Sequence, residues 1–213
     1  MRYTYPYPHP AVAADIAIFT VIDDALNLLL IERAEEPFRG CWALPGGFLQ
    51  EFEDLDACAR RELREETGVD AEVLMHFANF SAPDRDPRER VISVGYLALL
   101  PHENLKLVAS TDAAQARWFE VGWLPPLAFD HDVIVRGAVE FLRRQLSDLT
   151  LIFALLPREF TLTELQRAYE AVVGAPTEKR NFRKMALASG RLVETDRFSG
   201  GAHRPARLYR VAR

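Results

Sequence analysis

The sequence has few of the features that mark exported or membrane-embedded proteins. Its two cysteines, Cys41 and Cys58, are too few for a disulfide framework and lack the spacing of a metal site. No apolar run is long enough to span a membrane. Prolines interrupt the N-terminal stretch MRYTYPYPHPAV, where a secretory signal would have its apolar core. These absences favour a cytoplasmic protein without a membrane partner.

Charge is distributed unevenly along the chain. From Pro157 to Arg213 there are 12 Lys and Arg against 6 Asp and Glu, whereas the rest of the chain has 14 against 25, for a net charge of -5. The larger part therefore repels nucleic acid and the smaller part could attract it. We predict two domains, residues 1–148 and 149–213.

The larger part alternates strand and helix patterns. Strands are expected at 12–22, 26–33, 71–81, 90–100 and 116–121, and helices at 54–67 and 130–147. Between them, residues 42–49 are extended, and Gly46 and Gly47 predict a tight turn. The order predicts an α/β domain.

The smaller part has a different order. Thr161 and Glu164 form a capping-box pattern that opens a helix ending at Gly174. A second helix is expected at 177–189, followed by two strands at 191–197 and 206–212. Helix, turn, helix and hairpin is the order of a winged helix-turn-helix domain.

The helix at 54–67 carries acidic residues beside an apolar stripe. Leu55, Ala59 and Leu63 form the stripe, and Glu62 and Glu66 lie along it rather than on the solvent face. Two carboxylates in such a position repel each other and lose solvation, which a hard divalent cation such as Mg²⁺ corrects. A solvated face of ordinary ion pairs is the alternative, but it leaves the preceding Gly-Gly turn unexplained.

The spacing around these carboxylates is that of a known motif. From Gly47 to Val69 the pattern G-x5-E-x7-RELREETGV resembles the Nudix box at every position that the motif fixes. The resemblance implies an α/β/α sandwich with a mixed sheet. It also implies an enzyme that cleaves a nucleoside diphosphate linked to another moiety. It also implies Mg²⁺ or Mn²⁺ ligands at Glu53, Glu62, Glu65 and Glu66, and catalytic roles for Arg61, Glu62, Glu65 and Glu66. Arg61 would orient the glutamates, and the general base stays open.

A proline-punctuated loop supplies candidate substrate contacts. The loop contains Arg85, Arg88 and Arg90. Because arginine binds phosphate bidentately, we expect these side chains to hold a diphosphate together with the Gly46-Gly47 turn. A polar loop tied together by Asp84 and Asp86 is the alternative. The loop sequence, with residues 118–132, resembles Nudix domains that recognise ADP-ribose. Within that stretch, His131 next to Asp130 could be an acid or base, but its position at a helix start favours a structural role.

The helix at 177–189 is rich in basic residues. Phe182, Met185, Ala186 and Ser189 form a stripe expected to pack inward, while Leu187 falls outward without explanation unless the hairpin covers it. The basic side chains on the other face suit insertion into the major groove of double-stranded DNA. The predicted DNA contacts are Lys179, Arg180, Asn181, Arg183 and Lys184 on the helix, with Arg197, His203 and Arg204 around the wing. A basic face without a partner is the alternative.

The C-terminal part as a whole, from Phe153 to Val211, is similar to the winged-helix domain of the Nudix-related transcriptional regulators (NrtR). That resemblance implies a homodimeric repressor of NAD-metabolism genes, which binds DNA and responds to ADP-ribose or a related nucleoside diphosphate. Some members have a degraded box and bind without cleaving, so hydrolysis by this intact box stays open. The main rival is a Mg²⁺-dependent pyrophosphohydrolase whose winged helix serves dimerisation or protein contact. An RNA-decapping or nucleotide-pool enzyme has less support, because only the box points there.

Overall fold

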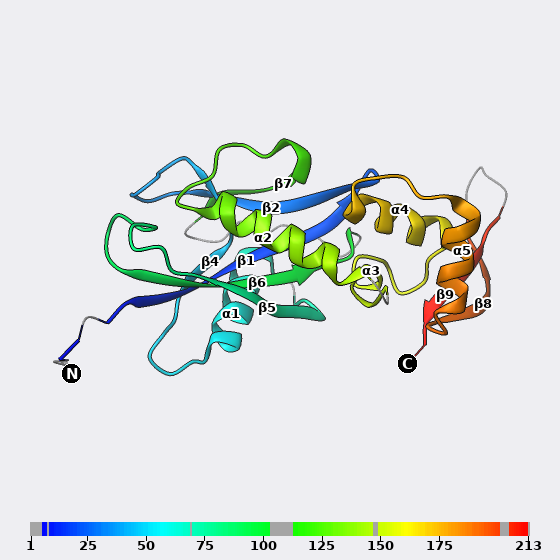
Figure 1. Ribbon diagram of the computed structural model, residues 1–213, viewed down its shortest axis with the longest axis horizontal. Coiled ribbons are helices and arrows are strands. Elements are labelled where there is room, and N and C mark those ends of the chain that lie inside the picture. The colour runs from blue at the N-terminus through cyan, green and yellow to red at the C-terminus, as the bar shows by residue number, and fades with distance from the viewer. Residues whose placement is uncertain are drawn as a thin grey trace.

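The computed structural model describes residues 6–7, 9–68, 70–102, 113–146, 149–200 and 205–212. Figure 1 shows the elements in chain order. The first part contains β1 (Ala11–Ile22), β2 (Ala25–Arg33), β3 (Trp42–Ala43), β4 (Gly46–Phe48), α1 (Leu55–Thr67), β5 (Val73–Phe80), β6 (Val91–Leu99), β7 (Ala113–Glu120), the short 3-10 helix η2 (Val121–Trp123) and α2 (His131–Arg144). The second part contains α3 (Thr150–Phe153), α4 (Leu162–Val173), α5 (Lys179–Ala188), β8 (Leu192–Phe198) and β9 (Arg207–Val211).

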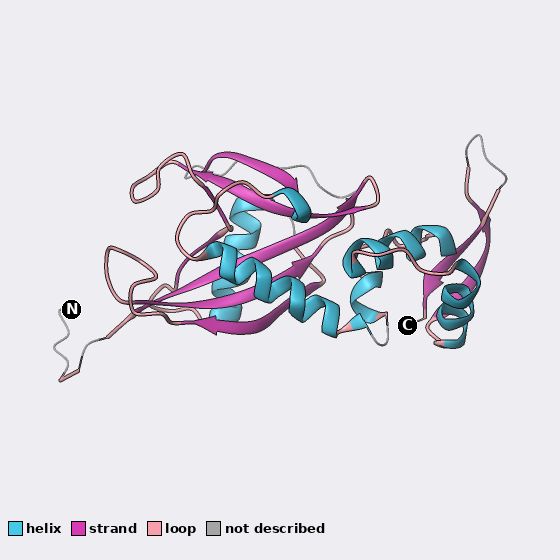
Figure 2. Ribbon diagram, turned by 45° about the horizontal axis from the view of Figure 1, so that its top comes forward, coloured by secondary structure: helices cyan, strands magenta, loops and turns pink. Residues whose placement is uncertain are grey.

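One mixed sheet organises the first part. Its strand order is β3-β2-β1-β6-β5, with β4 also paired to β1 and β7 to β2. The pair β1–β6 is parallel and the other pairs are antiparallel. Figure 2 shows a helix on each face of this sheet. The predicted α/β/α sandwich with a mixed sheet is therefore confirmed.

Alternation along β1 explains the two layers. Ile16 and Ile18 lie in the cluster of buried residues that includes Leu63 of α1. The intervening Ala17 and the following Phe19 lie in the cluster that includes the buried residues of α2. Successive side chains of a strand point to opposite faces, so one strand contributes to both hydrophobic layers.

Local sequence signals define the ends of α1. The carboxylate of Asp54 accepts a hydrogen bond from the Ala57 N–H at 2.8 Å, which caps the N-terminus. Gly68 adopts a left-handed conformation at φ 68°, and its N–H donates to the Arg64 carbonyl at 2.8 Å. The helix therefore occupies the predicted segment, and its register places Glu62 and Glu66 toward the sheet.

The second part is a winged helix. The capping box of Thr161 and Glu164 opens α4, and Gly174 ends it at φ 79°. Helix α5 begins at Lys179 because the Glu178 carboxylate accepts the N–H groups of Arg180 and Asn181. Strands β8 and β9 form an antiparallel hairpin beside α5. This order confirms the predicted winged helix-turn-helix.

The prediction that Met185 of α5 packs inward was wrong. Phe182 and Ala186 are buried, but Met185 is 41% exposed. The buried stripe is narrow, because Phe182 packs on Tyr169 of α4 and Met185 falls to one side of that contact. Leu187 is 49% exposed, so the hairpin does not cover it.

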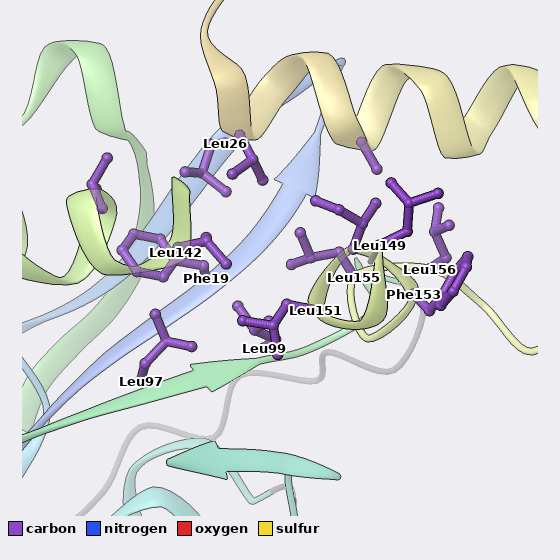
Figure 3. Close-up of a cluster of buried hydrophobic side chains, with 14 of the residues drawn as sticks. Phe19, Leu26, Leu97, Leu99, Leu142, Leu149, Leu151, Phe153, Leu155 and Leu156 are labelled. Carbon is purple, nitrogen blue, oxygen red and sulfur yellow. The ribbon is translucent and has the colours of Figure 1, made fainter. Parts of the chain in front are cut away.

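The two parts share hydrophobic packing. Figure 3 shows Phe19 and Leu26 of the sheet and Leu142 of α2 near the side chains of Leu149–Leu156. The same cluster continues to Leu165 of α4 and to residues of the winged helix beyond it. The segment at α3, for which no helix was predicted, forms this junction. The predicted division after residue 148 falls between α2 and α3 and stays a prediction.

A polar contact joins the two parts as well. The Arg143 side chain of α2 donates from Nε to the Val172 carbonyl at 2.8 Å, near the C-terminus of α4. A cation at that end of a helix satisfies a terminal carbonyl and complements the helix dipole. Within the described ranges, no helix is long and apolar enough to cross a membrane.

Candidate functional site

Arg61 lies at the centre of the predicted metal site. Its guanidinium contacts Glu53 at 2.7 Å, Glu62 at 2.6 Å and Glu65 at 3.2 Å. It also donates to the Phe48 carbonyl at 3.3 Å, which ties α1 to β4. The geometry gives Arg61 the contacts that an orienting role requires. That role stays a prediction.

The two inner carboxylates are withdrawn from solvent. Glu62 is 8% exposed and Glu66 is 6% exposed, so both lie toward the sheet as the spacing predicted. A Cβ atom on Gly47 would lie 2.1 Å from Oε1 of Glu62, and a Cβ on Gly46 would lie 2.2 Å from the Ala14 carbonyl oxygen. Gly47 therefore lets the backbone approach the Glu62 carboxylate closely, and Gly46 allows a close approach to β1. Both glycines lie in strand β4, so the tight turn predicted for them was wrong.

Arg61 and burial act in opposite directions on the neighbouring carboxylates. The hydrogen bonds from Arg61 lower the pKa of Glu53 to about 2. Burial raises the pKa of Glu62, although the hydrogen bond from Arg61 acts against it. Arg61 thus favours the ionised form of Glu53, while burial disfavours the charged form of Glu62.

The donor set suits a hard divalent cation. Hard divalent cations prefer carboxylate oxygens, and the Glu62 carboxylate lies directly beside the Gly47 backbone. In the part of the chain that the structure describes, no group of three potential ligands is already arranged around a metal position. Arg61 instead contacts three of the four predicted ligands, so a bound cation would replace some of those contacts.

A buried polar network surrounds Asp15, which pairs with Gly46 of β4 in the sheet. Asp15 of β1 accepts a hydrogen bond from Ser93 of β6 and lies 3.4 Å from Nη2 of Arg85. Nε2 of His131 lies 3.7 Å from Asp15, and Nδ1 of His131 accepts the Leu44 N–H at 2.9 Å. Burial lowers the pKa of His131, so the imidazole is neutral with its proton on Nε2. The network fixes Leu44 just ahead of β4, which agrees with the structural role predicted for His131.

Sequence reasoning missed Asp15 and Ser93. Both are polar residues inside otherwise apolar strand segments, AVAADIAIF and VISVGY. A buried polar side chain requires a hydrogen-bond partner, so this interruption was the available signal.

The three loop arginines occupy different environments. Arg85 is buried and pairs with Asp130 at 2.7 Å, in addition to its contact with Asp15. Arg88 pairs with Asp86 at 2.7 Å and lies over the ring of Phe48 at 5.4 Å. Arg90 is exposed. The guanidinium of Arg85 is thus held by protein carboxylates, whereas Arg88 and Arg90 remain accessible to a ligand.

The predicted DNA contacts of α5 share one property. All are exposed: Lys179, Arg180, Asn181, Arg183 and Lys184. Among the ion pairs formed within the described residues, none involves a basic side chain of this helix. Arg197 of β8 is also exposed, but it pairs with Glu159 at 2.8 Å. His203 and Arg204 lie outside the described residues.

Comparison with known proteins assigns each part separately. Residues 11–138 match the family model described as NUDIX domain. Residues 152–211 match the model described as NrtR DNA-binding winged helix domain.

Individual relatives match one or both parts. The "ADPR responsive transcriptional repressor NtrR" of Acinetobacter baylyi is 38% identical over 209 residues, which cover 97% of this chain and 84% of the relative. The crystal structure of Shewanella oneidensis NrtR complexed with a 27mer DNA superposes with a TM-score of 0.84 at 30% identity, covering 94% of this chain and 93% of the other. The "ADP-ribose pyrophosphatase" of Methanocaldococcus jannaschii is 42% identical over 130 residues, 61% of this chain and 73% of the relative.

Proposed function

The chain belongs to the Nudix family and carries an NrtR-type winged helix after its Nudix domain, and from that premise we propose a DNA-binding transcriptional regulator that responds to ADP-ribose. It acts as a homodimeric repressor of genes of NAD metabolism. The exposed basic face of α5 carries the proposal, since these side chains have no ion-pair partner among the described residues. A charged face of this kind is available to the phosphates and base edges of DNA.

Helix α5 enters the major groove. Arg180, Asn181 and Lys184 reach base edges, and the exposed side chains of Arg183 and Lys179 bind phosphates. Arg197 of the hairpin exchanges its ion pair with Glu159 for a contact with the DNA backbone. A homodimer presents two such helices to half-sites about one helical turn of DNA apart, as in other helix-turn-helix dimers.

ADP-ribose binds at the Nudix domain. Glu53, Glu62, Glu65 and Glu66 would hold Mg²⁺, which would supply positive charge for the diphosphate and activate water for hydrolysis. Arg88 and Arg90 add positive charge from the loop, and the backbone of Gly46 and Gly47 in β4 borders the ligand. Arg85 supports this arrangement through its contacts with Asp15 and Asp130.

A second candidate function is that of a Mg²⁺-dependent ADP-ribose pyrophosphohydrolase. The intact box and the similarity to an ADP-ribose pyrophosphatase favour it. In that case the winged helix serves dimerisation or protein contact, and the α5 face has no DNA partner.

A pull-down of sheared genomic DNA from the source organism separates the two. The purified protein is tested at fixed, near-physiological salt with and without ADP-ribose, because affinity for DNA depends steeply on salt. The regulator retains a few fragments and releases them when ADP-ribose is added. Diffuse retention that is sensitive to salt but indifferent to ADP-ribose would contradict the regulator and favour the enzyme.

Glu66→Gln tests the metal site directly. We expect the variant to fold and to lose Mg²⁺-dependent AMP release from ADP-ribose, because the amide is a neutral and weaker ligand. Glu51→Gln, at an exposed position outside α1, is the matched control and retains the activity of the parent protein. Full activity in Glu66→Gln would place the metal elsewhere. If neither the parent nor the control releases AMP, the Nudix domain senses the ligand without cleaving it.

A further inference from the structure

An exposed leucine lies within the basic face of α5. Leu187 follows Arg180 by seven residues and Lys184 by three, so the three side chains share one side of the helix. Leu187 is 49% exposed, whereas Phe182 and Ala186 on the opposite side are buried. Packing of the folded chain does not account for a large apolar side chain at this position.

The second exposed apolar residue of α5 lies elsewhere. Met185 is 41% exposed and follows Phe182 by three residues, so it borders the buried stripe. Isolated exposed apolar residues are common in proteins and need no special explanation. The surroundings distinguish the two: Leu187 lies among cations that would bring DNA against it, and Met185 does not.

The N-terminus of α5 is already satisfied within the chain. The Glu178 carboxylate accepts the N–H of Arg180 at 2.9 Å and the N–H of Asn181 at 2.7 Å. The helix end therefore offers these donors to its own cap and not to a DNA phosphate. Recognition has to come from side chains on the outward face, where Leu187 is the large apolar group.

Given the proposed function, we propose that Leu187 recognises the 5-methyl group of a thymine in the major groove. That methyl is the apolar group that a base edge presents there, and contact with an apolar side chain distinguishes thymine from cytosine. Arg180 and Lys184, which precede Leu187 on the same face of α5, hold the DNA, while Leu187 makes binding depend on sequence. The contact removes from water an apolar surface that the free protein leaves exposed.

Deoxyuridine substitution tests this contact, because deoxyuridine differs from thymidine only by the missing methyl group. The full-length protein is titrated with a duplex from a retained genomic fragment and with duplexes in which each thymine is replaced in turn. At one thymine in each half-site, we expect the replacement to weaken binding about threefold to tenfold. Leu187→Ala weakens binding to the parent duplex by a similar factor and removes the sensitivity at that thymine.

Two variants on the same helix are matched controls. Met185→Ala keeps both the affinity and the sensitivity to deoxyuridine. Arg180→Ala binds all duplexes more weakly but keeps the sensitivity. Thermal melting of each variant shows whether the fold is retained.

Three results would overturn the inference. The parent protein could bind every substituted duplex equally well, or Leu187→Ala could keep the full sensitivity. Alternatively, Leu187→Ala could change the oligomeric state in sedimentation, which would make the residue part of an interface between copies of the chain. If the parent protein retains no specific fragment at all, the proposed function itself fails and this inference fails with it.

Discussion

Helices α1 and α5 both carry charged residues at helical spacing, but the two sets of charges have different surroundings. On α1, Arg61 contacts Glu53, Glu62 and Glu65 within 3.2 Å. On α5, the basic side chains are exposed and form no ion pair among the described residues. The charges of α1 are organised before any ligand arrives, while those of α5 stay in water until a partner binds.

Packing explains this difference. Helix α1 lies against the sheet, with Glu62 and Glu66 buried beside its apolar residues. Charges in that position interact strongly, because less water screens them. Helix α5 buries only Phe182 and Ala186, so its charges keep their hydration. Removal of a paired charge beside the sheet on α1 should therefore affect folding, and removal of an exposed charge on α5 should affect DNA binding.

The largest effect is expected from Arg61→Ala. Loss of the guanidinium leaves the buried carboxylate of Glu62 without its cation, which costs about 3 kcal/mol in the free energy of unfolding. Urea denaturation without divalent cations measures this loss. Added Mg²⁺ should raise the unfolding midpoint of the variant more than that of the parent, because the cation takes over beside the same carboxylates.

Arg60→Ala is the control for this variant. Arg60 is an exposed residue of the same helix, so the free energy of unfolding should change by less than about 0.5 kcal/mol. Equal stability of Arg61→Ala and Arg60→Ala would show that the contacts of Arg61 contribute nothing to folding, and the contrast between the helices would disappear.

An intermediate effect is expected from Lys184→Ala. The free energy of unfolding should change by no more than about 0.5 kcal/mol, because the Lys184 side chain is exposed and forms no ion pair within the described part of the chain. Affinity for DNA should fall by about 1 kcal/mol, and the slope of log K against log salt should decrease by about 1, since one phosphate contact is lost. Titrations at several salt concentrations measure both. A loss of stability without a change in the salt slope would contradict the assignment of this face to DNA.

The smallest effect is expected in the buried network around Asp15 and His131. Because burial lowers the pKa of His131 below 6.5 in the folded protein, the unfolded chain binds a proton more readily in the range below that value. Stability should therefore decrease as the pH falls through this range. His131→Asn keeps an acceptor for the Leu44 N–H but removes the titration, so the free energy of unfolding should depend less on pH.

Urea denaturation at a series of pH values tests this expectation. His76→Asn makes the same substitution at an exposed histidine and is the matched control. An unchanged pH dependence in His131→Asn would mean that His131 does not contribute to the acid sensitivity of the fold.

Local signals predicted most of the fold. Asp54, Gly68 and Thr161 act through residues three or four positions away, so their helices could be placed from the sequence. The position of Glu62 and Glu66 beside the apolar stripe likewise follows from helical spacing. These predictions needed no knowledge of how distant segments meet.

Contacts between distant segments were not predictable in the same way. Arg85 lies 70 positions from Asp15, and His131 lies 87 positions from Leu44. Their pairing depends on the register of β1 with β6 and on where α2 begins, which only the assembled sheet determines. The same applies to Met185, since its exposure depends on how narrow the contact between α5 and α4 is.

The hydrophobic cluster shared by both parts has a thermodynamic consequence. It runs from Phe19 of β1 through Leu142 and Leu149 to Tyr209 of β9 without a break. Because the core of the winged helix includes residues of the neighbouring domain, we expect the two parts to unfold together. A ligand that binds only the native Nudix domain then adds RT ln(1 + [L]/Kd) to the stability of the whole cooperative unit. The elements that hold α5 in place would gain resistance to heat from a molecule that they never touch.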